Sequence, residues 1–202
     1  MRWNVLVAVS VVLVAAAGCS SEPETRTAAG VPSRWYTTVD DALAGRPDVT
    51  SIGQLENGGP CPLRDDVAVA GNKLTDVSDH GVVRLGGHVP AVLCSWYENR
   101  VVDVEVAHAP DAGRYAELVT GSHAVDQPGN EQTERDVAVG TRTVRVVRIV
   151  YPTNPAAGTS LVAYLLDEGS RGRVRMEVHR VQTISGYDET SAAEDLLAFV
   201  DS

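Results

Sequence analysis

Residues 89–107 read VPAVLCSWYENRVVDVEVA and contain the pattern that decides the fold. The second half of this stretch, 101–107, places a valine at every second position, with Asp103 and Glu105 between the valines. A period of two predicts a strand with one buried and one exposed face. Glu98-Asn99-Arg100 predicts a hairpin turn, which would pair this strand with the apolar segment before it.

Further segments extend this antiparallel pattern. Along 173–181 apolar side chains alternate with a charged set, which consists of Arg173, Arg175, Glu177 and His179. We expect strands at 82–85, 89–97, 101–107, 137–139, 143–151, 161–166 and 173–181, and helices at 39–44, 63–70, 110–121 and 188–200. Since the strands come in runs rather than in strict βαβ alternation, we expect an α+β fold, with an antiparallel sheet, helices on one face and one disulfide.

The N-terminus is typical of an exported chain. Residues 5–17 are apolar except for Ser10, a run too short for a membrane span, which needs about 20 apolar residues. Small residues precede Cys19, as in the bacterial lipobox, where the cysteine is diacylated and becomes the mature N-terminus. We therefore expect residues 1–18 to be a signal peptide and Cys19 to be the lipidation site, anchoring the domain on the outer face of the cell membrane. Ordinary secretory cleavage and an uncleaved anchor are the alternatives, and both place the domain outside.

Composition divides the rest of the chain. Residues 19–33 are rich in small and polar residues and predict a flexible, lipid-anchored tether. Residues 34–202 have the length of a single α+β domain. The breaker Asn57-Gly58-Gly59-Pro60 places the start of the compact core near residue 60. Whether residues 34–59 pack on that core is left open.

The cysteine count supports export. With Cys19 lipidated, Cys61 and Cys94 remain as a pair. In an oxidising compartment they would form a disulfide that stabilises the domain by roughly 3 to 4 kcal/mol in the chain-entropy model. Trp96 follows Cys94 by two residues, so it should share the same face and cover the bridge. A zinc site would need more ligands at short spacing, and a redox pair is more often Cys-x-x-Cys.

The segments Cys61-Pro62-Leu63 and Cys94-Ser95-Trp96 resemble a family of actinobacterial lipoproteins of unknown function, the DUF3558-like group. Its members show an early cysteine followed by a short apolar helix, then Cys-x-Trp on a strand, then a strand of alternating valines. The resemblance covers roughly residues 60–108. It implies an envelope lipoprotein domain and no known reaction.

The charge balance limits the class of partner. The chain has 27 acidic and 17 basic residues and a net charge of −10. This balance argues against nucleic acid and against binding an anionic membrane by bulk charge. The expected partners are the membrane, through the lipid anchor, and an envelope protein, lipid or glycan.

No catalytic residue, metal ligand or cofactor site is predicted. The five histidines show no metal-ligand spacing, and no nucleophile elbow, phosphate loop or dinucleotide fingerprint occurs. Asp79-His80 could approach His88, but a surface or turn role is favoured. Ser122-His123 followed by Asp126 has the letters of a triad, yet catalytic triads are assembled across a fold.

Two charged clusters are weaker candidates. Carboxylates gather between the cysteines at Asp65, Asp66, Asp76 and Asp79. They lack the spacing of an EF-hand, so solvated charge is favoured over calcium binding.

The second cluster is basic. Arginine grips phosphate or carboxylate with two hydrogen bonds, so a group of arginines could bind an anionic envelope ligand. Pairing with neighbouring Asp and Glu is the favoured account. The candidate anion-binding residues are Arg171, Arg173 and Arg175, with Arg142, Arg145 and Arg148 on another strand.

Three hypotheses follow. The first is a non-enzymatic envelope module that binds a protein, lipid or glycan near the membrane. The second is a cell-envelope hydrolase whose site is assembled from dispersed residues, and the third is a purely structural lipoprotein. A deep apolar pocket would favour lipid binding, convergent Asp, His or Ser in a cleft would favour an enzyme, and a flat apolar patch would favour a protein partner.

Overall fold

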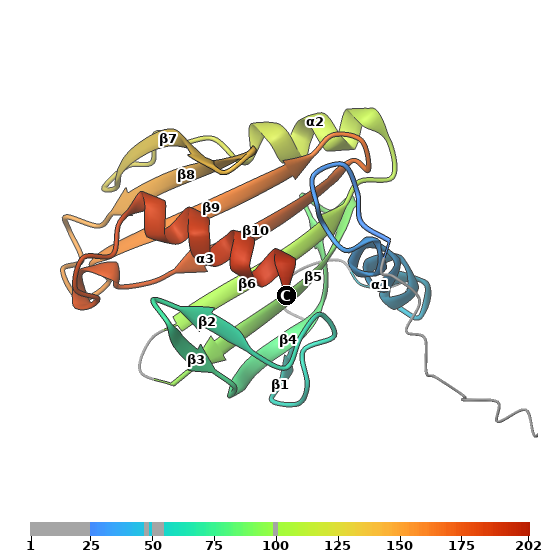
Figure 1. Cartoon of the computed structure of the whole chain (residues 1–202), viewed down its shortest axis with the longest axis horizontal. Coiled ribbons are helices and arrows are strands. Elements are labelled where there is room, and N and C mark those ends of the chain that lie inside the picture. Colours follow the sequence, from blue (N-terminus) through green and yellow to red (C-terminus); the bar gives the residue numbers. More distant parts are fainter. Residues whose placement is uncertain (1–24, 47–48, 50–54, 99–100) are drawn as a thin grey trace, which may run out of the picture.

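The computed structural model describes residues 25–46, 49, 55–98 and 101–202 (Figure 1). The predicted signal peptide, Cys19 and the turn residues Asn99 and Arg100 lie outside the described residues. In the described part of the chain, no helix is long and apolar enough to cross a membrane. A large antiparallel sheet with helices packed on it confirms the α+β class.

The large sheet has the strand order β1-β4-β5-β6-β10-β9-β8-β7, and a separate hairpin joins β2 to β3. The helices are α1 (Ser33–Ala44), α2 (Ala112–Thr120), α3 (Glu189–Asp201) and the short 3-10 helix η2 (Val181–Thr183). The strands are β1 (Glu56–Asn57), β2 (Val67–Val69), β3 (Asn72–Leu74), β4 (Val77–Leu85), β5 (Val89–Tyr97), β6 (Val101–His108), β7 (Glu131–Val139), β8 (Arg142–Val150), β9 (Thr159–Asp167) and β10 (Gly172–Val178).

The central strands β5, β6 and β10 assign side chains to the two faces of the sheet. Val104 of β6 lies opposite Cys94 of β5 and Met176 of β10, and all three are buried. We call this side the core face. Successive side chains point to opposite sides of a strand, so Asp103 and Glu105 lie on the other side, which we call the polar face.

Helices α1 and α3 cover the core face, as predicted (Figure 1). Helix α1 packs on β4 to β6, and α3 packs on β7 to β10 and on β2. Helix α2 differs, because its Leu118 packs with Val83 and Val89 on the polar face. Small side chains at Ala91 and Ala107 leave room for the helix there. The expectation that all helices lie on one face is therefore wrong for α2.

Helix α1 begins six residues earlier than the predicted helix at 39–44. Trp35, Tyr36 and Val39 are buried on its inner side. Val31, just before the helix, is fully buried as well. The core therefore includes residues far ahead of residue 60, and residues 25–33 are packed on the domain instead of belonging to the predicted tether.

The segment 63–70, predicted as a helix, contains strand β2 of a hairpin. Val67 and Val69 are buried while Ala68 between them is exposed, which is the alternation of a strand. Ala70 and Gly71 have φ values of 51° and 74°, as a two-residue hairpin turn requires. Ala70 and Gly71 therefore form a hairpin turn before Asn72, the first residue of β3, where the sequence pattern predicts the end of a helix.

The expected disulfide joins Cys61 to Cys94. Both cysteines belong to the main core cluster. Trp96 is fully buried on the same face as Cys94, and its ring lies edge-on to Phe199 of α3 at 6.4 Å between centroids. The bridge therefore ties the segment before β2 to the central strand β5.

Replacing Cys61 and Cys94 together with serine should lower the free energy of unfolding. We expect a loss of about 3 to 4 kcal/mol, because a 33-residue loop is no longer closed in the unfolded chain. Urea denaturation of a soluble chain beginning at Ser20 measures this loss. Wild-type protein kept in reductant should unfold at the same midpoint as the double-serine variant, and an unchanged midpoint in both would contradict the prediction.

Candidate functional site

A row of polar side chains crosses the middle of the polar face. The strand register aligns Glu105 of β6, Arg175 of β10, Tyr164 of β9, Arg145 of β8 and Asp136 of β7. Because side chains alternate along each strand, all five lie on the same side of the sheet. Carboxylates and guanidinium groups are thereby brought within reach of one another.

The arginines predicted as an anion site are largely taken up by carboxylates. Arg173 lies 2.5 Å from Glu105, and Arg175 is paired with Glu177. The side chains of Arg173 and Glu105 are only 7% and 8% exposed. Arg171 is separate, exposed in the turn between β9 and β10. Pairing with nearby carboxylates, the favoured account from the sequence, therefore describes Arg173 and Arg175.

Arg173 also fastens α2 to the sheet. Its Nη1 donates to the carbonyl oxygen of Leu118 and to the hydroxyl of Ser122, each at 3.1 Å. Carbonyl groups in the last turn of a helix lack partners within the helix. Arg173 therefore has a structural role beneath α2.

Three titratable side chains meet where β10 ends. The Nε2 atom of His179 lies 2.9 Å from Oδ2 of Asp103, and Nδ1 lies 3.6 Å from Oε1 of Glu177. Nδ1 also lies 3.2 Å from the hydroxyl of Ser160. Ser95 donates to Oδ1 of Asp103 at 2.6 Å. We call His179, Asp103 and Glu177 the His179 cluster.

The His179 cluster favours a protonated imidazole. Burial opposes charge on the ring and is the largest influence, but the hydrogen bond to Asp103 and the nearby Glu177 carboxylate together outweigh it and raise the pKa of His179. For Asp103, burial is again the largest influence and acts upward, yet the bonds from His179 and Ser95 leave its pKa below the usual value. His179 therefore keeps its proton to a higher pH than a free imidazole does.

The same three side chains are a candidate metal site. Their ligand atoms all lie within 4.8 Å of one another, and imidazole with carboxylate suits several divalent metals. The two carboxylates, however, face different ring nitrogens of His179. A metal binds one of these nitrogens, whereas an imidazolium donates from both. The geometry therefore fits a proton better than a metal ion.

Ser160, His179 and Asp103 also form the hydrogen-bond chain of a hydrolytic triad. Ser160 is fully buried, so its hydroxyl cannot reach a substrate in solvent. Ser122 and His123, which the sequence places next to each other in the order of a triad, do not hydrogen-bond to each other in the structure. Ser122 is buried and donates to Leu118, and His123 contacts Glu134.

A hollow of about 290 Å³ opens beside the cluster. It is lined by Val101, Tyr151, Ala157, His179 and Arg180. Arg180 is exposed and has a φ of 54°, a backbone conformation that costs a non-glycine residue roughly 1 to 2 kcal/mol. The hollow therefore combines an exposed guanidinium and an imidazole with apolar walls.

The remaining sequence candidates stay apart. His80 lies 3.9 Å from Glu56, and His88 is exposed in the turn between β4 and β5. Asp66 is paired with Lys73 and Arg64, and these bonds lower its pKa. The Asp66 carboxylate is thus already paired with cations of its own chain. This agrees with the hypothesis favoured from the sequence, which did not assign these carboxylates to calcium.

Sequence reasoning did not single out the His179 cluster. Asp103 and His179 are 76 residues apart, so no local spacing reveals them. The signal was the alternation in two strands, which put charged residues of each strand on one side. Only the pairing of β6 with β10, with Asp103 opposite Glu177, turns that alternation into a site.

Stability should depend on pH through His179. Its folded pKa lies above the unfolded value of about 6.5, so its contribution is fully present below about pH 6.5 and is lost as pH rises through the raised pKa. His179→Gln should remove this part of the pH dependence, measured as unfolding free energy from about pH 5.5 to pH 9. His88→Gln is the control, since His88 is exposed in a turn. If H179Q and the wild type keep the same profile, the cluster does not hold the proton.

Comparison with known proteins finds no matching family model, no matching curated protein and no matching solved structure. The resemblance to the DUF3558-like group therefore stays a prediction from two short cysteine motifs. The function of the chain has to be inferred from its own residues.

Proposed function

We propose that this chain is an exported lipoprotein, acylated on Cys19 and anchored at the outer face of the cell membrane. Its domain acts as a non-enzymatic binding module for an anionic component of the cell envelope. The ligand binds in the hollow beside His179. The leader pattern and the cysteine count support this cellular location, and the hollow supports the binding role.

The single observation that carries the binding role is an exposed guanidinium, Arg180, which shares one hollow with the imidazole of His179 and with apolar side chains. His179 is 32% exposed and has a raised pKa, and Arg180 is exposed beside it. Val101 and Ala157 supply apolar surface in the same hollow. A phosphate or carboxylate oxygen fits the guanidinium of Arg180, because charge-assisted hydrogen bonds are the stronger ones, whereas both ring nitrogens of His179 already face groups of the chain itself.

The size of the hollow favours a small polar group over an enclosed acyl chain. The hollow beside His179 has a volume of about 290 Å³. Pockets for drug-sized ligands usually span roughly 300 to 1,000 Å³. A headgroup or a sugar acid is therefore the better match in size.

Backbone strain gives independent support. Among the described residues, the other two non-glycine residues with positive φ, Ala70 and Arg171, lie in hairpin turns. Arg180 instead joins β10 to η2 and lines the hollow. Strained backbone conformations cluster at binding and catalytic sites, where the surrounding structure holds them.

Catalysis is less well supported than binding. The convergence of serine, histidine and aspartate was the feature expected to favour an enzyme. The hydroxyl of Ser160 is buried behind His179, so the group that would attack a substrate is the one that solvent cannot reach.

Titration with two probes tests the binding role. Glycerol phosphate represents phospholipid headgroups, and N-acetylmuramic acid represents carboxylated wall sugars. We expect one of them to shift the amide NMR signals of His179 and Arg180 in a soluble chain beginning at Ser20. Arg180→Gln should weaken that binding by about ten-fold, because a charge-assisted hydrogen bond contributes roughly 1.5 kcal/mol or more.

Arg171→Gln is the matched control for Arg180→Gln. Arg171 is also an exposed arginine with positive φ, but it lies before β10, at the other end of that strand. The variant should bind both probes as the wild type does. Equal weakening by the two substitutions, or no response at the hollow to either probe, would contradict the proposal.

Acylation is tested separately by labelled fatty acid in an actinobacterial host. The wild type should incorporate label and the Cys19→Ala variant should not, because the thioether to the lipid needs the cysteine sulfur. Ser20→Ala is the control and should keep the label. Equal labelling of wild type and C19A would show that Cys19 is not the acylation site.

A further inference from the structure

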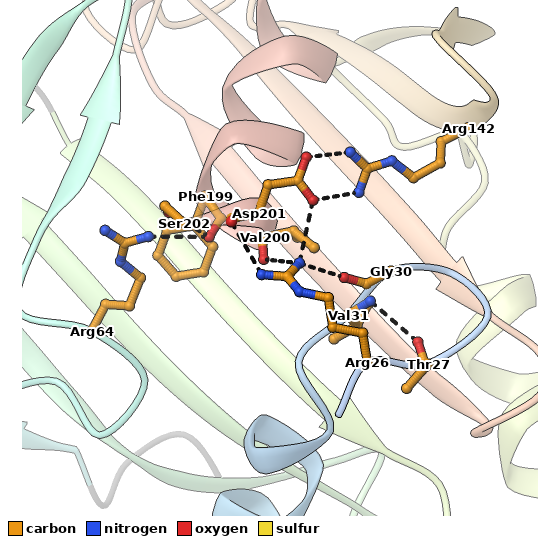
Figure 2. Close-up of polar contacts among 10 residues, drawn as sticks. All are labelled: Arg26, Thr27, Gly30, Val31, Arg64, Arg142, Phe199, Val200, Asp201 and Ser202. Carbon is orange, nitrogen blue, oxygen red and sulfur yellow. Dashed lines mark hydrogen bonds and ion pairs between the residues drawn. The ribbon is translucent and has the colours of Figure 1, made fainter. Parts of the chain in front are cut away.

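The first described residues fold back onto the C-terminal end of α3 (Figure 2). The backbone of Arg26 pairs with that of Pro32 in an isolated antiparallel bridge. Within this loop, Val31 donates to the side chain of Thr27 at 3.2 Å. The loop is therefore a defined part of the domain.

Arg26 links this loop to α3. Its Nη1 donates to the carbonyl of Val200 at 3.2 Å, and Nη2 donates to the carbonyl of Asp201 at 3.1 Å. The last carbonyl groups of a helix lack partners and carry partial negative charge, so a guanidinium is favoured there. The Asp201 carboxylate also bridges Arg26 to Arg142, the first residue of β8 (Figure 2). We call Arg26, Arg142 and Asp201 the clamp.

The clamp leaves little chain between the domain and the predicted anchor. Only residues 19–24 precede the described loop. Six extended residues span at most about 20 Å. The tether expected from composition, 19–33, would have reached about 50 Å. The clamp therefore determines which end of the domain lies next to Cys19.

The hollow beside His179 lies at the opposite end of the same sheet. Strand β8 starts at Arg142 in the clamp and ends at Val150, one residue before Tyr151 in the hollow. At about 3.3 Å per residue, this separation is roughly 30 Å. Helix α3 spans the same distance in the opposite direction, from Glu189, which pairs with Arg148 near the end of β8, to the clamp at Asp201 (Figure 1).

The clamp end contains several cationic side chains, although the chain as a whole is acidic. Arg64 donates to the carbonyl of Phe199 beside the clamp, and Asp66 pairs with both Arg64 and Lys73. Together with the clamp residues, these contacts place four cations, Arg26, Arg64, Lys73 and Arg142, beside the carboxylates of Asp66 and Asp201. The whole chain carries −10. An anionic lipid surface therefore repels this end less than the net charge of the whole chain would suggest.

We propose that the clamp orients the domain on the membrane. The clamp end faces the phospholipid headgroups, and the His179 hollow faces away from them, toward the rest of the envelope. This inference rests on the proposed acylation of Cys19. The anchored domain then presents its binding site about 30 Å or more beyond the clamp.

Spin labels on the full, lipidated chain test the orientation. Ala68→Cys places a label on β2, near the clamp end, and Ala156→Cys places one beside the hollow; both positions are exposed. The protein is bound to vesicles of phosphatidylglycerol and phosphatidylcholine containing a nickel-chelating lipid. We expect strong relaxation of the label at residue 68 and little at residue 156.

Two further variants test the role of the clamp. A Gly-Ser insertion after Glu24 leaves the domain unchanged but frees it from the surface, so relaxation at residue 68 should fall. Arg26→Gln should act in the same direction, whereas Arg171→Gln should have no effect.

The outcomes separate the orientation from the acylation. Protein that fails to float with the vesicles overturns acylation of Cys19, and this inference with it. Protein that floats but shows equal relaxation at residues 68 and 156 overturns the orientation alone. A pattern that the insertion leaves unchanged also overturns it, because the short connection would then not set the orientation.

Discussion

The one-residue alternation along β6 and β10 is the constraint on which both the core and the candidate site depend. Val104 opposite Met176 belongs to the core, whereas Asp103 opposite Glu177 belongs to the polar face. A slip of one residue would turn charges toward α1 and α3 and valines toward solvent, so burial specifies the register strongly. The cluster around His179 is therefore held in place by the apolar side chains on the reverse of the same strands.

Exposure separates the structural charges of the polar face from those available to a ligand. A buried ion pair offsets its desolvation only with good geometry and further hydrogen bonds. Arg173 and Glu105 are nearly inaccessible, and Arg173 finds additional partners at the end of α2. In the His179 cluster, the side chains of His179 and Asp103 are 32% and 21% exposed. The first pair fastens a helix to the sheet, while the second is open to solvent and can respond to its pH.

Features that depend on neighbouring residues or on residue counts could be predicted from the sequence. The valine alternation predicted β6, the cysteine count predicted the Cys61–Cys94 bridge, and both are confirmed. The predicted helix at 63–70 was wrong: Leu63 and Val67 have helical spacing, but Val67 and Val69 have the spacing of a strand, and the turn at Ala70 and Gly71 completes a hairpin. The site needed long-range information, since the sequence shows that Arg173 and Arg175 share a face but not which carboxylates lie opposite. His179 and Asp103 meet only through the β6–β10 pairing.

The N-terminal segment shows the same limit and has the larger functional consequence. Its small and polar composition is that of a tether, yet Arg26 bonds to Val200, 174 residues later, and Val31 is fully buried. Composition describes how a segment behaves alone, whereas these contacts depend on where α3 ends. Strand β8 runs from the clamp to the hollow within one sheet. Fixing the clamp relative to the membrane would therefore also fix the position of the hollow. Arg26 bonds to the last carbonyl groups of α3. In an acylated chain, these bonds would then also determine the distance between the membrane and the hollow beside His179.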